Sequence, residues 1–180
     1  MPLVIHEHGP LFRVARAGWH DPVDASYSTR ESHRWNPPNA YPVLYTCCSE
    51  TVARAVVRHV FNITSVELDE LQPDVRPTLA ELDWSGEVVD MASVAGLVEC
   101  GFRISYPEGY THAHTQPFAT GWHVLGAEGV LCRSDAVFRT NHRGWVGEHE
   151  EWSELAIFIW NATVAPRLLT SRPDFDWQLE

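Results

Sequence analysis

Short apolar runs, separated by polar segments that often contain proline, dominate the hydrophobic pattern of the 180-residue chain. Five of these runs have the length and the β-branched or aromatic content that are typical of strands. The predicted strands cover residues 11–16, 41–48, 86–91, 128–134 and 154–162. Because no run approaches about 18 uninterrupted apolar residues, the sequence predicts no membrane-spanning helix.

Three further segments carry apolar residues at the spacing of an amphipathic helix. These helices are expected over residues 49–61, 92–101 and 114–126. Ser49 is a suitable N-cap for the first helix, on which Val52, Val56 and Val60 form one apolar face. Each of the other two segments ends at a glycine, as helices often do.

The polar segments at residues 17–40 and 135–152 are predicted to be loops. Since the predicted strands and helices do not alternate along the chain, the pattern favours the mixed α+β class. No repeat or low-complexity segment divides the chain, whose length suits one domain. We therefore expect a single domain over residues 1–180, with its core at about 11–160.

The charge balance narrows the classes of partner. Thirteen Lys and Arg against 24 Asp and Glu give a formal net charge of -11, which disfavours direct binding to nucleic acid or to an anionic membrane surface. Against this acidic background, four arginines lie close together in the sequence, at positions 13, 16, 30 and 34. Because guanidinium groups match phosphate and carboxylate geometry, this concentration favours a small anionic ligand.

The four cysteines, Cys47, Cys48, Cys100 and Cys132, fit neither a zinc ribbon nor the disulfide framework of a small secreted domain. The N-terminus also lacks a basic segment followed by a long apolar run, which a secretory signal would need. We therefore expect a reduced, cytoplasmic protein.

Histidine pairs offer an alternative chemistry. His6 with His8, and His112 with His114, have the two-residue spacing that places both imidazoles on one face of a strand. With cysteines such as Cys132 they would supply ligands for zinc. Since no HExxH or paired CxxC motif is present, we expect no metal. A nucleophilic Cys132 is a second alternative, although a cysteine inside an apolar strand is usually inert.

Arg13 lies within LFRVAR, and Arg34 is followed by Trp35 shortly before a proline turn. Tyr45 comes eleven residues after Arg34, and Ser134 ends the apolar run EGVLCRS. In this order and spacing the chain resembles the RES domain family over nearly its whole length. The family takes its name from an Arg, a Glu and a Ser that are scattered over the fold.

The adjacent Arg30, Glu31 and Ser32 are therefore a coincidence of sequence. The resemblance implies an α+β fold similar to ADP-ribosyltransferases, with antiparallel sheets and flanking helices around a nucleotide cleft. It also implies that NAD or a related dinucleotide is bound, since family members act as toxins that break NAD by hydrolysis or phosphorolysis. Such toxins are restrained by a paired antitoxin, here expected to be a helix-turn-helix protein. Association of the chain with a second copy of itself, as a homo-oligomer, is a further alternative.

The roles that the resemblance implies agree with the chemistry of NAD. Arg13 and Arg34 would hold the pyrophosphate, with Trp35 beside them. Tyr45 would stack on the nicotinamide ring, and the hydroxyl of Ser134 would bond to a ribose or phosphate oxygen. Breaking the nicotinamide–ribose bond develops positive charge on the ribose, which a nearby carboxylate stabilises. A carboxylate is therefore expected in the site.

The chain departs from the family pattern at this carboxylate. The glutamate is expected eleven residues after Tyr45, and Val56 stands there. Near the last predicted strand, where an asparagine is usual, stands Ser153 or Glu154, and Glu154 would contribute a carboxylate from the other side.

Two functions stay open. The first is an enzyme that cleaves NAD, and the second is a RES-like fold with lost or redirected catalysis, acting as a nucleotide-binding or interaction module or on another NAD-like substrate.

Overall fold

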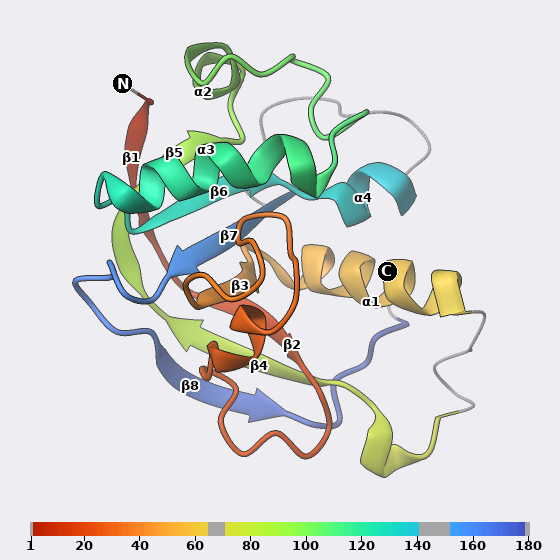
Figure 1. The fold of residues 1–180 in the computed structure, drawn as a ribbon. Helices are drawn as coiled ribbons and strands as arrows, with labels where there is room; N and C mark the ends of the chain where they lie inside the picture. The colour runs from red at the N-terminus through yellow and green to blue at the C-terminus, as the bar shows by residue number, and fades with distance from the viewer. Residues whose placement is uncertain (1, 65–70, 141–151, 179–180) are drawn as a thin grey trace.

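The computed structural model of the chain describes residues 2–64, 71–140 and 152–178, which form a curved eight-stranded sheet with flanking helices (Figure 1). The strand order across the sheet is β1-β5-β6-β7-β3-β2-β4-β8. The strands are β1 (Val4–His8), β2 (Leu11–Ala15), β3 (Val43–Cys47), β4 (Thr78–Asp83), β5 (Ser85–Met91), β6 (Gly129–Arg133), β7 (Ser153–Phe158) and β8 (Arg167–Arg172). Among these strands β5 and β6 run parallel, and the other neighbours are antiparallel.

Four α-helices and two short 3-10 turns complete the described part of the chain. They are α1 (Glu50–Thr64), α2 (Val94–Glu99), α3 (His112–Val124), α4 (Asp135–Thr140), η1 (Ser26–Thr29) and η3 (Pro73–Val75). Serine side chains begin three of the helices, because a hydroxyl oxygen there accepts a bond from an otherwise unpaired backbone N–H. Ser49 accepts from Val52, Ser93 accepts from Gly96, and Ser134 accepts from Val137. None of the described helices has the length and apolarity needed to cross a membrane.

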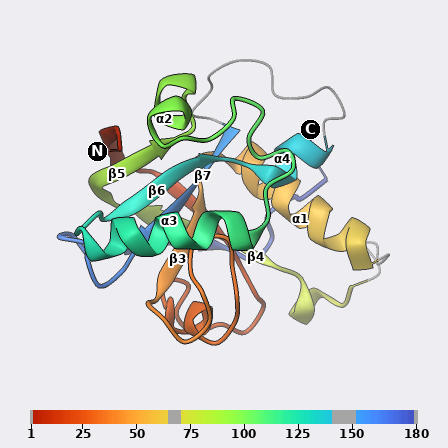
Figure 2. The ribbon, with the colours of Figure 1, turned by 45° about the horizontal axis from the view of Figure 1, so that its top comes forward.

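The central strands are covered on both faces, which explains their nearly continuous apolar sequences. All five residues of β6 are buried. On one face, α2 and α3 lie over β5, β6 and β7, as both views show, and Leu97, Trp122 and Phe158 are buried between them (Figure 2). Alternate residues of the same strands, such as Leu131 and Leu155, point to the opposite face and pack in a second cluster.

A third apolar cluster packs α1 against α4 and the C-terminal segment. Val52 and Val57 of α1 pack with Val137 of α4 and with Trp177 near the C-terminus. This cluster places α1 and α4 next to each other, at the side of the sheet where β3 and β7 pair.

The five predicted strands and three predicted helices are all confirmed, with ends shifted by a few residues, and so is the α+β class. In place of several antiparallel sheets, the described strands form one sheet that contains a parallel pair. The loop predicted over residues 135–152 is wrong at its start, because α4 begins at Asp135; residues 141–151 lie outside the described part.

Strands β1, β4 and β8 were not predicted from the sequence. Two of them, β1 and β8, form the edges of the sheet, and most residues of β8 are exposed. An edge strand needs no apolar run, because one side of it faces solvent. Helix α4 was not predicted for a related reason, since its six residues include two charged ones, and among residues 135–139 only Ala136 and Val137 are buried in the core.

Two glycines make a matched test of the packing. A methyl group at Gly129 on β6 would lie 2.6 Å from the carbonyl oxygen of Ala156, whereas one at Gly121 on α3 would meet nothing within 4 Å. We expect Gly129→Ala to lower the free energy of unfolding by about 1 to 3 kcal/mol through overpacking. Gly121→Ala should raise it by about 0.5 to 1 kcal/mol. Denaturant melts of both variants check this, and equal effects would contradict the central position of β6.

Candidate functional site

Two pockets flank the point where β6 ends and α4 begins. The smaller one, the sheet pocket, has a volume of about 220 Å³, and the larger one, the helix pocket, of about 470 Å³. The sheet pocket is lined by side chains that include Arg13, His33, Tyr45, Cys47, Val56 and Glu154. The helix pocket is lined by side chains that include Arg34, Tyr106, Tyr110, His112, Asp135 and Arg139. Four of the residues that the sequence proposes as NAD contacts, Arg13, Arg34, Tyr45 and Glu154, therefore line one of these two pockets, as does Val56.

The hydroxyl of Tyr45 ties the polar segment before β3 to the sheet. It donates a hydrogen bond to Oδ1 of Asn36 at 2.7 Å and accepts one from the backbone N–H of Trp35 at 3.0 Å. Burial raises the pKa of this hydroxyl, so it stays protonated and keeps its donor role. The ring of Tyr45 lines the sheet pocket, and the ring of His33 lies 5.5 Å from it between centroids.

Arg13 enters the sheet pocket from β2, but much of its guanidinium is already engaged. Its Nη1 donates to the carbonyl oxygens of Pro22 at 2.6 Å and Asp24 at 3.2 Å, and the group lies 5.1 Å from the ring centroid of Trp19. Burial lowers the pKa of Arg13 to about 10, against the opposing effect of Asp24 and Asp21. Arg13 therefore remains a cation at neutral pH and holds the loop around residues 19–24 against the sheet.

Val56 and Glu154 reach the sheet pocket from different elements. Val56 comes from α1 and is half-buried, with part of its side chain packed against the third apolar cluster. Glu154 comes from β7 and pairs in register with Cys47 of β3. Among the residues that line this pocket, Glu154 is the one with a carboxylate.

Ser134 fixes the carboxylate of Glu154. Its hydroxyl donates to Oε1 of Glu154 at 2.6 Å and accepts a bond from the backbone N–H of Val137 at 3.2 Å, so one buried side chain caps α4 and holds the acid. Ser134 is fully buried and lines neither pocket. The structure thus brings Ser134 to the site as a support for Glu154.

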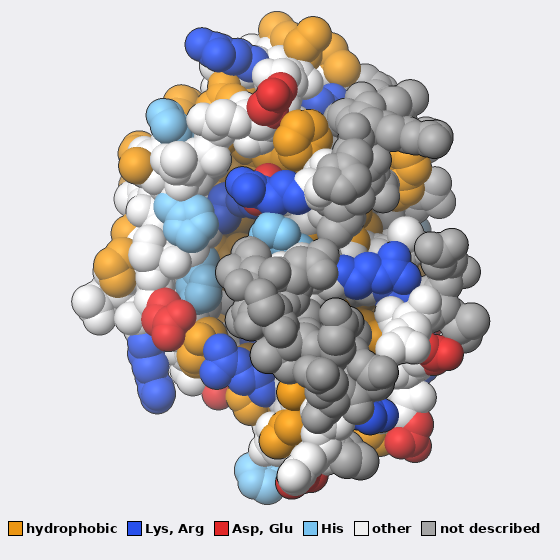
Figure 3. Space-filling model, turned by 90° about the vertical axis from the view of Figure 1, so that its right-hand side faces the viewer, with side chains coloured by type: hydrophobic (Ala, Val, Ile, Leu, Met, Phe, Trp, Pro, Cys, Tyr) orange, Lys and Arg blue, Asp and Glu red, His pale blue; other side chains and the backbone are white. Residues whose placement is uncertain are grey.

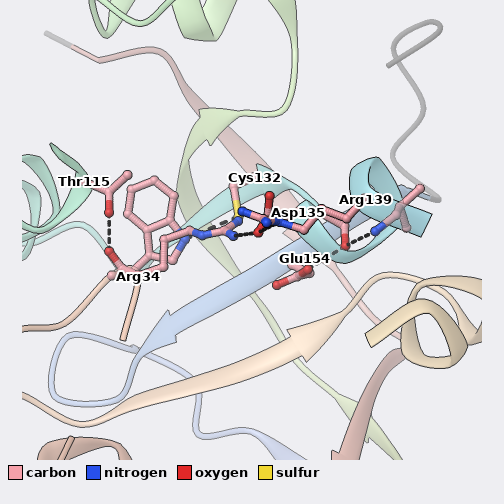
Figure 4. Close-up of polar contacts among 9 residues, drawn as sticks. Arg34, Thr115, Cys132, Asp135, Arg139 and Glu154 are labelled. Carbon is pink, nitrogen blue, oxygen red and sulfur yellow. Dashed lines mark hydrogen bonds and ion pairs between the residues drawn. The ribbon is translucent and has the colours of Figure 1, made fainter. Parts of the chain in front are cut away.

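Arg34 lies on the wall of the helix pocket. Its Nη2 is 3.3 Å from a carboxylate oxygen of Asp135, and its backbone carbonyl accepts a bond of 2.5 Å from the hydroxyl of Thr115 on α3 (Figure 4). Asp135 also pairs with Arg139 at 2.7 Å. Burial by itself lowers the pKa of Arg34, whereas Tyr106 and Glu154 raise it, and the net shift is upward. The guanidinium is therefore charged at any physiological pH.

Nη1 of Arg34 and the hydroxyl oxygen of Tyr106 are buried beside the helix pocket without a hydrogen bond of good geometry. Buried polar groups are rarely left in this state, because an unmade bond costs about 1 to 3 kcal/mol. The two side chains nevertheless lie close to each other, since Arg34 opposes the rise that burial gives the pKa of Tyr106. Asp135 lies between two guanidinium groups, so this wall keeps an excess of positive charge. Viewed from the side where α1 and α4 lie, arginine and histidine side chains stand next to one another near the middle of the surface (Figure 3). The helix pocket is therefore suited to an anion.

Trp35 occupies a different place from its neighbour Arg34. Its ring is 1% exposed and packs against Tyr106 and Trp122, and its Nε1 donates to the sulfur of Cys132 at 3.3 Å. Trp35 lines neither pocket, so it supports the site from within the core.

The histidine and cysteine alternatives have separate positions in the fold. His6 and His8 lie on the edge strand β1, whereas the ring of His114 accepts a bond from the backbone N–H of Thr111 at the start of α3. Within the described residues, no group of three or more His, Cys, Asp or Glu side chains could hold a metal ion. Cys132 is fully buried on β6.

Sequence reasoning missed Tyr106, Asp135 and His33, and it considered His112 only as a metal ligand. Tyr106 and His112 reach the helix pocket from a loop and a helix start that are far from Arg34 along the chain, so no spacing marks them, whereas His33 directly precedes Arg34. Asp135 had a weak signal, since it follows Ser134 directly at the end of an apolar run. Burial lowers the pKa of His33, so its ring is neutral at physiological pH.

Comparison with known proteins adds an independent line of evidence. The family model described as the RES domain matches residues 10–178. Among solved structures, a chain of the M. tuberculosis MbcT–MbcA toxin–antitoxin complex is similar in fold, with a TM-score of 0.74 and 18% sequence identity over 94% of this chain and 87% of that one. A search of curated proteins gave no match.

Alkylation of Cys132 tests whether this buried cysteine is an inert core residue or an activated nucleophile. Burial raises its pKa to about 11, and Glu154 adds to the effect. Because the thiolate is the reactive form, iodoacetamide at neutral pH should leave Cys132 of the native protein unmodified. In concentrated guanidinium chloride all four cysteines should react, as read by mass spectrometry of peptides. Fast native labelling of Cys132 would instead show an activated nucleophile.

Proposed function

Because this chain belongs to the RES domain family, we propose that it binds NAD and cleaves its nicotinamide–ribose bond in the manner of a toxin. The pyrophosphate would lie in the helix pocket against Arg34, and the nicotinamide end would reach the sheet pocket beside Tyr45. The ADP-ribosyl group that remains after the cleavage is transferred to water or to phosphate. No metal takes part in this proposal.

The observation that carries the proposal is the state of the Arg34 guanidinium. It is a permanent cation, its side chain is 21% exposed on the wall of the helix pocket, and its partner Asp135 is shared with Arg139. A pyrophosphate oxygen would contact the exposed part of this guanidinium, whose forked geometry suits two-point contact with phosphate. Arg13 would contribute through its charge at the other pocket, because its Nη1 already bonds to carbonyl oxygens.

A protein partner is the second part of the proposal. The similar solved chain comes from a toxin–antitoxin complex, which supports an antitoxin as the partner that restrains this chain. We propose a helix-turn-helix protein in that role and a cytoplasmic location. An activity that depletes NAD would harm the cell that makes it, so a restraint of this kind is expected.

Val56 favours a second candidate function. Since α1 offers an apolar side chain to the sheet pocket where the family pattern has a glutamate, the chain would bind a dinucleotide without cleaving it, as a binding or interaction module. The two candidates differ in one measurable quantity, the release of nicotinamide.

Calorimetric titration with NAD and chromatography of released nicotinamide test the proposal together. We expect heat of binding with NAD and with ADP-ribose, and release of nicotinamide below the roughly 10 per second that is typical of enzymes. Binding without release would select the second candidate. Absence of both would remove NAD from the function of this chain.

Replacing Arg34 tests the anion contact. We expect Arg34→Lys to weaken NAD binding by about 1 to 3 kcal/mol, because a forked, charge-assisted contact becomes a single-point one. Arg167→Lys is the matched control, since Arg167 also pairs with an aspartate, Asp83 at 2.9 Å, but lies on β8 away from both pockets. Calorimetry measures the affinities and thermal melts check the fold. An Arg34→Lys variant that melts much lower but binds NAD unchanged would make Arg34 a structural residue.

A further inference from the structure

The two sides of the sheet pocket differ in a way that bears on cleavage. Val56 from α1 presents an apolar side chain, and Glu154 from β7 presents the carboxylate among the lining residues. Both side chains border the same space of about 220 Å³, which Tyr45 also lines. A carboxylate on either side would therefore lie next to a ribose bound in this pocket.

Glu154 is held on a rigid part of the fold. Its backbone lies in the middle of the sheet, where β7 pairs with Cys47 on β3 and with Cys132 on β6. Its Oε1 accepts the bond from the fully buried Ser134, and among the described contacts Oε2 has no hydrogen-bond partner. An acid whose one oxygen is fixed and whose other oxygen is available is suited to act on a ligand, because no reorganisation is needed during the reaction.

The charges of the two pockets match the charges of NAD. The helix pocket carries two arginines, Arg34 and Arg139, against one carboxylate, Asp135. The sheet pocket carries the anion Glu154 together with Arg13, whose Nη1 is turned to the carbonyl oxygens of Pro22 and Asp24. NAD has a negative pyrophosphate at its centre and a positive pyridinium ring at its nicotinamide end. A dinucleotide that places its pyrophosphate at Arg34 would therefore turn its cationic end toward Glu154.

We propose that Glu154 is the catalytic carboxylate of this chain and takes the place that Val56 leaves empty on α1. This inference rests on the proposed cleavage of NAD. The bond between C1′ of the ribose and N1 of the nicotinamide breaks, both electrons go to N1, and neutral nicotinamide leaves. The positive charge passes to the ribose ring, where the Glu154 carboxylate stabilises it. Water then adds to C1′ and loses a proton to solvent, which gives ADP-ribose.

The test replaces the charge of Glu154 without changing its shape. We expect Glu154→Gln to reduce nicotinamide release by about 100-fold or more, because loss of one preorganised charge commonly costs this much. NAD affinity, measured by calorimetry, should change by less than about threefold, because the charge acts on the transition state. Glu81→Gln is the matched control, since Glu81 is also half-buried on a strand, β4, but lines neither pocket.

A second variant moves the acid across the pocket. Val56→Glu combined with Glu154→Gln should recover part of the lost nicotinamide release, because a carboxylate again faces the ribose. Thermal melts show whether the double variant is folded; if it is not, the comparison of Glu154→Gln with Glu81→Gln decides the matter alone.

The outcomes separate this inference from the function on which it rests. If the parent protein releases nicotinamide and Glu154→Gln releases it within about threefold of the parent rate, the inference is wrong and the proposed function stands. If the parent binds NAD but releases nothing, Glu154 is no catalytic residue and cleavage is lost as well. If the parent neither binds nor cleaves NAD, the proposed function itself fails.

Discussion

The pairing of β7 with both β3 and β6 is the constraint on which the candidate site depends. Through this pairing, residues from three separate stretches of the chain come to fixed positions: Tyr45 on β3, Ser134 just after β6, and Glu154 on β7. The neighbouring residues of β7 are fully buried on both faces of the sheet, so the strand cannot shift without exposing apolar area on both sides. The Ser134–Glu154 hydrogen bond then follows from the register.

The segment before β3 is attached to this framework by hydrogen bonds as well as by the buried ring of Trp35. Tyr45 holds the backbone of Trp35 and the side chain of Asn36, and α3 contributes Thr115, which bonds to the carbonyl of Arg34. Since each of these groups would lose a bond on moving, the segment is over-determined in spite of its polar sequence. Arg34 is therefore presented to the helix pocket by a rigid support, which lowers the entropy lost on binding an anion.

The site separates opposite charges within an acidic protein. Arg34 and Glu154 lie in adjacent pockets and are joined through Ser134 and Asp135, so that each influences the other electrostatically without forming an ion pair. A direct pair would neutralise both groups and leave little field for a ligand. The separation suits a dipolar ligand such as NAD. It places a positive and a negative group at the two ends of the site, which the net charge of -11 does not suggest.

The sequence by itself determined the α+β class, the buried strands and three helices, because apolar periodicity reports which faces are covered, and the spacing of Arg34, Tyr45 and Ser134 indicated the RES family. It also predicted a departure from the family pattern at Val56. The edge strands β1 and β8 and the short helix α4 were decided by tertiary contacts, since their own sequences carry little apolar pattern. Tertiary contacts also decided the roles of individual side chains. The sequence placed Trp35 and Ser134 among the ligand contacts, whereas the fold buries both, because packing and hydrogen-bond partners from distant strands decide which way a side chain points.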